Sequence, residues 1–298
     1  MEEVIRDYYY RHVRIPYSEF LMKRRCHIMD TDATIDYILQ WHCSVSRFGD
    51  GEFFVMDGGS QGFQTYDERL AAKLQEVLDN PVENHLSCLP ICFIKSSMML
   101  ERAQRFWQYF VAIHYKMLLR HIRKGYTYGD AQITRFYIDY IDKSMSERRF
   151  NRIKSLWDGR DVIIIEGGKT RSGVGNDIFQ NAHSIKRILG PAENAFSKYD
   201  ELLLSVRNHA SKENLILISL GLTATVMAYD LAKLGYWAID LGHLDVEYEW
   251  MKMGATEKIP LPYRYVNEAS EKGGNIVDEC TDSNYLSEII DNVVCKSL

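Results

Sequence analysis

The chain has 298 residues, 46% apolar and 26% charged, and its 36 basic and 41 acidic side chains give a net charge of -5. That length can bury a core in one or two domains, and the acidic balance excludes a basic footprint for nucleic acid. The first residues hold no apolar signal core, and no stretch approaches the roughly 18 apolar residues that span a membrane. The six cysteines match no zinc-binding spacing, so we expect a cytoplasmic protein with free thiols.

The first 25 residues combine three consecutive tyrosines with a short basic cluster, Lys23 to Arg25. We expect a peripheral helix or arm here, and contact with the inner face of a membrane is an alternative that this composition leaves open. We find no clear interdomain linker. The sequence therefore predicts a single domain over residues 1–298, with a core at about 30–258 between the arm and a C-terminal extension.

Apolar side chains at helical spacing predict several helices. One begins near Asp30, a second begins at Asp67, and the longest occupies residues 99–123. The apolar stripe of this longest helix contains Phe106, Phe110, Ile113, Met117 and Leu118.

Shorter sequence patterns predict the remaining segments. Arg135 lies within a further expected helix, and Ser144 with Glu147 resembles a capping box at the start of another. Residues 86–94 are typical of a buried strand, interrupted by a proline, and a final helix is expected near 286–294.

An Asp-x-Glu motif follows an apolar run at residues 45–52. Its carboxylates are Asp50 and Glu52, glycines lie on both sides of Asp50, and Arg47 precedes them. Carboxylate oxygens suit Mg²⁺ or Mn²⁺, and the glycines allow a sharp turn close to a ligand. The motif could therefore hold a divalent cation against a diphosphate, with Arg47 on a phosphate oxygen; a solvated turn without a ligand is the alternative.

Four consecutive β-branched residues within 161–166 predict a strand buried on both faces, as in a parallel sheet. A basic, glycine-rich loop follows, and we expect a helix over 178–188 after it. Free amides at such a helix start favour an anion, so the loop is a candidate phosphate site, or else a long loop with a glycine turn. The candidate residues in this loop are Arg171, Gly173, Asn176 and Asp177.

A βαβ unit is predicted over residues 214–242. Its first turn contains Gly221 and Thr223, and its second strand ends at Asp240. In Rossmann-like units the first turn meets phosphate and an acidic residue after the second strand binds ribose hydroxyls, so Thr223 and Asp240 are candidates for those contacts. The G-x-G-x-x-G pattern is absent, which argues against a plain NAD site.

Ionisable side chains alternate with other residues directly after that strand. His243, Asp245 and Glu247 are the catalytic candidates, and a carboxylate here could be the general base for a hydroxyl nucleophile; we prefer Glu247 over Asp245. A polar helix start at the surface is the alternative interpretation. Together these segments predict an α/β fold, a Rossmann-like and mostly parallel sheet flanked by helices.

Four segments together resemble the GT-D-fold glycosyltransferases. The segments are residues 47–52, residues 166–167 with 171–179, residues 220–230 and residues 240–250. The resemblance implies transfer of a hexose, glucose in the type case, from a UDP-sugar to a growing glycan on a bacterial surface protein. It also implies that Asp50 and Glu52 bind the metal. Family members occur fused to other transferase domains, so the resemblance also implies partner glycosyltransferases. The sequence departs from the family at Leu222, where proline is usual.

The predicted function is therefore a metal-dependent glycosyltransferase that moves glucose or galactose from a UDP-sugar to a glycan or glycoprotein acceptor. Mn²⁺ or Mg²⁺ would be the cofactor. Two other functions stay open. One is a non-catalytic nucleotide-binding scaffold, a partner in a transferase complex. The other is a phosphohydrolase that uses the same metal and gives the sugar to water.

Overall fold

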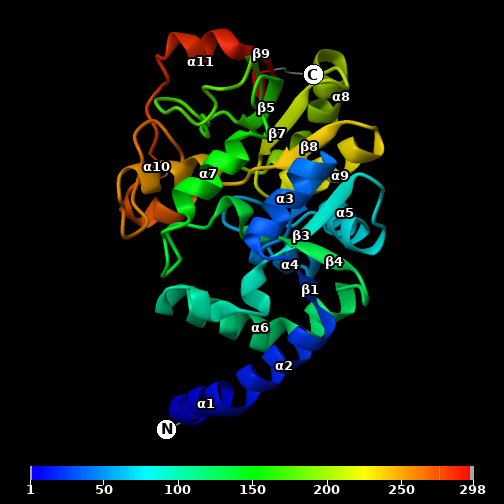
Figure 1. The fold of residues 1–298 in the computed structure, drawn as a ribbon, viewed down its shortest axis with the longest axis vertical. Helices are drawn as coiled ribbons and strands as arrows, with labels where there is room; N and C mark the ends of the chain where they lie inside the picture. The colour runs from blue at the N-terminus through cyan, green and yellow to red at the C-terminus, as the bar shows by residue number, and fades with distance from the viewer. Residues whose placement is uncertain (1, 275, 296–298) are drawn as a thin grey trace.

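The computed structural model describes residues 2–274 and 276–295, and its centre is a wholly parallel β-sheet (Figure 1). In sheet order the strands are β1 (His27–Ile28), β4 (Thr127–Asp130), β3 (His85–Leu89), β2 (Ser44–Arg47), β8 (Trp237–Asp240), β7 (Leu215–Ser219), β5 (Asp161–Gly167), β6 (Ser184–Gly190) and β9 (Ile289–Asn292). The predicted α/β class with a mostly parallel sheet is confirmed. In a parallel sheet all strands end at the same edge, so the polar turns after them converge there.

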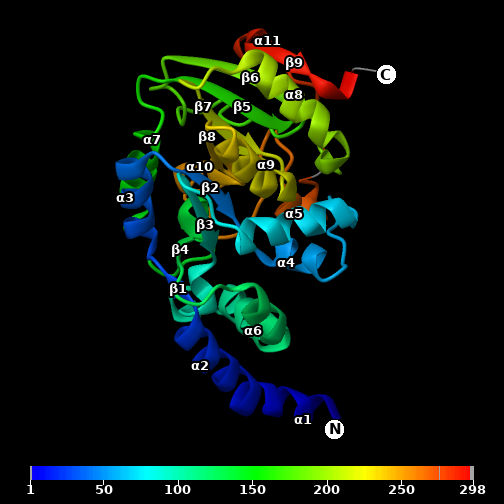
Figure 2. The same cartoon turned by 90° about the vertical axis from the view of Figure 1, so that its right-hand side faces the viewer.

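Helices cover both faces of this sheet. In chain order they are α1 (Glu2–Tyr9), α2 (Ile15–Arg25), α3 (Thr31–Trp41), α4 (Asp50–Met56), α5 (Glu68–Asp79), α6 (Glu101–His121), α7 (Ser146–Lys154), α8 (Tyr199–His209), α9 (Leu222–Lys233), α10 (Leu244–Lys252) and α11 (Ser283–Glu288). Figure 2 shows α5, α8 and α9 on one face of the sheet and α3 and α7 on the other. No helix within the described ranges is long and apolar enough to cross a membrane.

Local sequence signals account for the helices that were predicted correctly. The side chain of Asp30 accepts a hydrogen bond from the amide of Ala33, and that of Asp67 accepts one from Leu70, so each caps the helix that follows it. The β7–α9–β8 unit is present as predicted. Strand β5 is buried on both faces, because Val162 to Ile165 lie between β6 and β7 with helices above and below.

The structure corrects the helix expected over residues 178–188. That segment consists of turns up to His183, followed by β6, which pairs with β5 along its whole length. The apolar residues that suggested a helical stripe are strand residues instead, and their long-range pairing decides the conformation. The loop at 168–177 therefore leads to no helix start, and the anion site predicted there loses its helix dipole.

Other local predictions also need correction. Arg135 lies in irregular backbone after a short 3₁₀ turn, and α7 begins at Ser146 without a side-chain cap, so there is no capping box at Ser144. The strand at 86–94 ends at Leu89, and the expected last helix is divided between α11 and β9. On α6, Phe106 and Ile113 face solvent and do not join the buried stripe.

Candidate active site at the carboxyl edge of the sheet

A cleft opens among the loops that follow β5, β6, β7 and β8. Its lining includes Gly167, Pro191, Gly221 and His243 from those four loops. A later segment, residues 261–274, lies across one side and contributes Tyr265 and Asn267 to the lining. We refer to residues 261–274 as the strap. Ligands of α/β proteins bind at this edge, so the cleft is the candidate active site.

The Asp-x-Glu motif forms the first turn of α4, immediately after β2. Gly49 precedes the helix in extended backbone, and its amide donates to Glu52 Oε2 at 2.6 Å. The hydroxyl of Thr225 on α9 donates to the carbonyl of Arg47 at 3.0 Å and lies 3.4 Å from Glu52 Oε1. Glu52 is thus buried and held by the Gly49 amide, whereas Asp50 is partly exposed.

Burial gives both carboxylates an unusual affinity for protons. It raises the pKa of Asp50, and it raises the pKa of Glu52 to about 7, where the nearby Asp240 and Asp50 add repulsion. Crowded, desolvated carboxylates of this kind are stabilised by a cation. Within residues 2–274 and 276–295, no group of three or more His, Cys, Asp or Glu side chains could hold a metal. The two-carboxylate motif still fits Mg²⁺ or Mn²⁺, since such ions complete their coordination with substrate phosphates and water.

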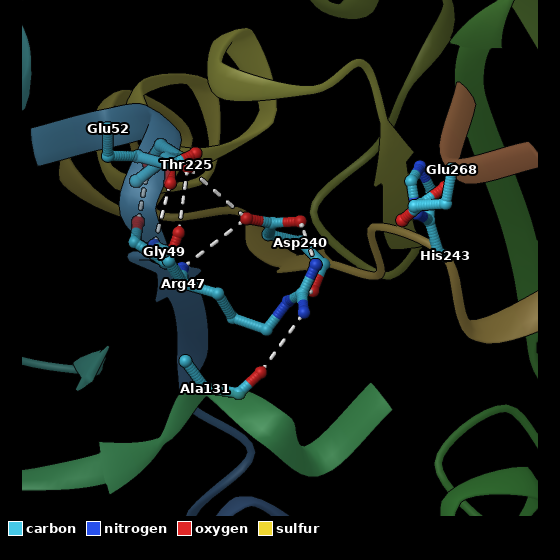
Figure 3. Close-up of polar contacts among 9 residues, drawn as sticks. Arg47, Gly49, Glu52, Ala131, Thr225, Asp240, His243 and Glu268 are labelled. Atoms are coloured by element: carbon cyan, nitrogen blue, oxygen red, sulfur yellow. Dashed lines mark hydrogen bonds and ion pairs between the residues drawn. The ribbon is translucent and has the colours of Figure 1, made fainter. Parts of the chain in front are cut away.

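Arg47, predicted to contact phosphate, is committed to the protein itself (Figure 3). Its Nη2 lies 3.0 Å from Asp240 Oδ1, its Nε donates to the carbonyl of Asp240, and its Nη1 donates to that of Ala131. A Cβ on Gly242 would lie 1.7 Å from Arg47 Nη2, so only glycine fits above the guanidinium. The buried pair thus joins the ends of β2, β8 and β4, and Asp240 is not free for ribose as predicted.

His243, the residue after Gly242, lines the cleft and remains 36% exposed at its side chain. Figure 3 shows His243 beside Glu268 of the strap. The Nδ1 of His243 lies 2.5 Å from Oε1 of Glu268, and Arg135 Nη2 lies 2.9 Å from the same oxygen. Burial alone would raise the pKa of Glu268, but His243 and Arg135 outweigh it and hold that pKa below its usual range. A carboxylate on one imidazole nitrogen fixes the ring and leaves Nε2 for chemistry.

Asp245 and Glu247, the other catalytic candidates, hold backbone in place. Asp245 Oδ1 accepts from the amide of Gly173 at 2.9 Å and from Asn176 Nδ2 at 2.7 Å, and Oδ2 pairs with Arg264 of the strap at 2.6 Å. Glu247 is 1% exposed, and its Oε2 accepts from the amides of Tyr137 and Ile138. Glu247 is therefore closed off from an acceptor hydroxyl, whereas Asp245 lines the cleft but is held by Gly173, Asn176 and Arg264.

The remaining candidates, in the loop after β5, also make contacts that hold the structure at this edge of the sheet. Arg171 is buried and donates to the carbonyls of Tyr263 and Asp278. Asp177 accepts from the hydroxyl of Tyr248, and the hydrogen bond and nearby lysines lower its pKa. Thr223 differs from these, because its buried hydroxyl oxygen has no hydrogen-bond partner in the part of the chain described.

Sequence reasoning missed two polar residues that shape the site, Arg264 and Glu268 of the strap. Nothing local in the sequence indicates that the strap returns to the sheet edge.

The wholly parallel sheet and its cleft define a Rossmann-like α/β protein with a ligand site at the carboxyl edge. The chain belongs to the family described as Glycosyltransferase GT-D fold, which matches residues 45–269. The family resemblance expected from the sequence is thereby confirmed.

Characterised relatives agree with this membership. The chain is 38% identical over 264 residues to Glycosyltransferase GlyD of Streptococcus pneumoniae, covering 88% of this chain and 32% of that protein. It is 39% identical over 272 residues to the probable glycosyl transferase Gly of Streptococcus gordonii, covering 91% of this chain and 39% of the relative. The chain therefore spans only a third or so of the curated relatives it matches.

Solved structures share the fold over nearly the whole chain. One, described as the highly conserved domain of unknown function 1792 with a distinct glycosyltransferase fold, has a TM-score of 0.86 and 41% identity, covering 92% of this chain and 99% of that one. Another, described as a new glycosyltransferase from Streptococcus sanguinis, has a TM-score of 0.84 and 38% identity, covering 90% of this chain and 99% of its own.

Proposed function

We propose that the chain is a metal-dependent glycosyltransferase that moves a hexose, glucose or galactose, from a UDP-sugar to a glycan acceptor in bacterial surface glycoconjugate synthesis. The observation that carries this proposal is the crowded carboxylate pair Asp50 and Glu52, which lies at the same carboxyl edge of the sheet as the cleft. Family membership supports the transfer chemistry. The relatives' names, which state glycosyl transfer, support it for the matched segment.

Asp50 and Glu52 would hold Mn²⁺ or Mg²⁺ in this proposal. Such an ion would offset the negative charge that develops on the departing UDP. Glu52 is held by the Gly49 amide at 2.6 Å, so the protein orients this ligand before the donor arrives. Asp50, the more exposed of the two, would be the carboxylate within reach of an ion at the cleft edge.

The diphosphate would lie against the turn between β7 and α9. Gly221 has a φ of +54° there, and the next helical amides begin at Leu222. Thr223 brings its unpartnered hydroxyl to this helix start, and α9 has 12 residues to supply a dipole. Free amides, a hydroxyl donor and a helix start together favour a phosphate oxygen.

We assign the general base to His243 in place of Glu247. Glu268 holds Nδ1, so the Nε2 of the neutral ring can take the proton from the acceptor hydroxyl. The hydroxyl oxygen then bonds to the anomeric carbon while the bond from that carbon to UDP breaks. Asp245, Glu247 and Arg47 keep the surrounding loops in position.

The test is a comparison of Asp50→Asn with Asp57→Asn, an exposed residue at the other end of α4. We expect Asp50→Asn to reduce UDP release and glycan transfer by at least about 100-fold, because it removes a metal ligand but keeps the side-chain shape. Asp57→Asn should be unaffected, and both variants should melt as the parent does. Full activity in Asp50→Asn would contradict the metal assignment.

A donor screen with the unmodified chain separates the alternatives. UDP-glucose and UDP-galactose are tested with and without Mn²⁺, by thermal shift and by product analysis, because a ligand at about 100 times its Kd adds about 2.7 kcal/mol. Metal-dependent binding with transfer supports the proposal. Binding without turnover favours the scaffold, and free sugar released at a rate that added glycan does not change favours the phosphohydrolase.

A further inference from the structure

The outer face of the N-terminal arm, defined here as residues 4–25, exposes a row of large apolar side chains. Helix α1 passes through a π-helical turn, Tyr10–Arg14, into α2 without a break. The exposed row consists of Ile5 at 62%, Tyr9 at 47%, Val13 at 51%, Tyr17 at 53% and Phe20 at 54% exposure. Steps of four and three residues put these side chains on one face of the helix.

The opposite face of the arm is fastened to α6. Ile15 and Met22 are buried there, and Arg14 Nε donates to the carbonyl of Ala112 at 3.0 Å. The rings of Tyr10 and Tyr109 stack with centroids 5.6 Å apart. Because these contacts fix the inner face, the apolar row is held outward as a formed surface.

Basic side chains accompany this apolar row. Residues 4–25 contain six Lys and Arg residues, of which Arg14 contacts α6, against two acidic ones, although the whole chain is acidic with a net charge of -5. Lys23, Arg24 and Arg25 are all exposed, and the guanidinium of Arg24 lies 5.5 Å from the ring centre of Phe20. The apolar row and a positive charge therefore share the same surface.

The arm also occupies an accessible place in the molecule. Figures 1 and 2 show α1 and α2 at one end of the longest axis, with α11 and β9 at the opposite end. The inner face of the arm meets α6, so its outer face turns away from the body. A flat surface can meet this end without colliding with the sheet domain.

We propose that the outer face of the arm docks the protein onto an anionic lipid surface. Tyrosine, phenylalanine and aliphatic side chains enter the headgroup region of a bilayer, and the Lys and Arg residues pair with acidic lipids. A second copy of the chain would bring an equally positive arm, which repels, whereas an anionic bilayer attracts every cation on this surface. The proposal does not depend on the activity at the cleft.

The test is co-sedimentation of the full chain with vesicles. Vesicles of phosphatidylcholine alone are compared with vesicles of equal parts phosphatidylcholine and phosphatidylglycerol, at low and high salt. We expect binding to the anionic vesicles only, and weaker binding as salt screens the charges. Val13→Asp, or Arg24→Glu combined with Arg25→Glu, should each weaken the partitioning about tenfold or more.

Matched controls lie far from the arm. Leu204→Asp alters another exposed apolar residue, on α8, and Lys186→Glu alters an exposed lysine on β6. Both should bind vesicles as the parent does, and all variants should melt at the parent temperature. No binding to anionic vesicles overturns the proposal. The alternative outcome is a chain that does not bind vesicles but forms a dimer in light scattering. If Val13→Asp converts that dimer to a monomer, the surface is a contact between copies of the chain instead.

Discussion

At the scale of single residues, the site depends on which polar atoms the protein leaves free. His243 has one nitrogen held by Glu268 and is 36% exposed on the cleft. Glu247 is buried with its Oε2 on two backbone amides, and Asp245 is occupied by Gly173 and Arg264. A base must reach the proton that it removes, so exposure and free lone pairs count before acidity. On that ground the imidazole is better suited than either carboxylate.

Replacing His243 tests this assignment directly. Asn at position 243 can still donate to Glu268 but has no group at the Nε2 position, so we expect kcat to fall about 10²- to 10⁴-fold with donor binding unchanged. Glu268→Gln should lose less, because the amide oxygen can still accept from Nδ1 and keep the ring oriented. Steady-state kinetics of both variants measure the two losses.

A control for Glu268→Gln lies on the same strap segment. Glu271 is exposed, so Glu271→Gln should leave the rate unchanged. If His243→Asn kept the full rate, the base would have to be another group.

The sequence identified where the site residues gather, but not what each does. Asp50, Thr223, Asp240 and His243 were expected at the carboxyl edge because each follows a predicted strand, and all lie at that edge. Their roles depend on partners from distant segments. The guanidinium of Arg47 is paired with Asp240 and with the carbonyl of Ala131, and no local sequence pattern indicates that pairing.

At the scale of elements, α10 and the irregular segment after β4 depend on each other. The carboxylate of Glu247 on α10 accepts the amides of Tyr137 and Ile138 at 3.0 and 3.1 Å, in the segment where the sequence predicted a helix. Burial raises the pKa of Glu247, and Arg135 with these amides opposes the rise. Two buried amides outside a helix need acceptors, and Glu247 supplies both.

The variant Glu247→Gln distinguishes a structural role of Glu247, as acceptor for these two amides, from a role as the general base. Gln keeps an acceptor oxygen, so we expect the free energy of unfolding to fall by about 1–3 kcal/mol with most activity retained. Glu247→Ala, which leaves both amides without an acceptor, should be less stable than Glu247→Gln. Urea unfolding and initial rates measure both quantities. A Gln variant of parental stability without activity would return the base to Glu247, as the sequence suggested.

Elements with local signals were the ones predicted correctly. Helices α3 and α5 have Asp caps, and the βαβ unit around α9 has its glycine turn. Strand β6 was mistaken for a helix because Ile185 and Ile188 fit either period in a short segment, and pairing with β5 decides between them. Strand β9 joins the sheet from a distant part of the chain, which no window of sequence contains.

At the scale of the whole molecule, the sheet has two halves that meet where β2 lies beside β8. Direct strand pairing there is limited to Val45 with Ile239, whereas β5 and β6 pair over seven positions. Side chains supply the rest of the junction. Ser46 donates to the carbonyl of Thr225, and the Arg47–Asp240 pair closes the carboxyl end.

Arg47→Met therefore tests the integrity of the whole sheet. Its side chain is 11% exposed and that of Asp240 is 4% exposed, so removing the cation leaves a buried carboxylate without its partner. We expect a loss of about 3–5 kcal/mol in the free energy of unfolding, and a partial recovery when Asp240→Asn is added. Urea unfolding followed by both tryptophan fluorescence and circular dichroism measures the loss and shows whether the two halves still unfold together.

The matched control is Arg69→Met, which breaks an ion pair with Asp200 whose side chains are 53% and 65% exposed. Exposed pairs contribute under about 1 kcal/mol, because water and salt screen them. An Arg47→Met variant no less stable than Arg69→Met would mean that the guanidinium does not hold the junction. Arg47 would then be available for a phosphate oxygen, as its place before the Asp-x-Glu motif first indicated.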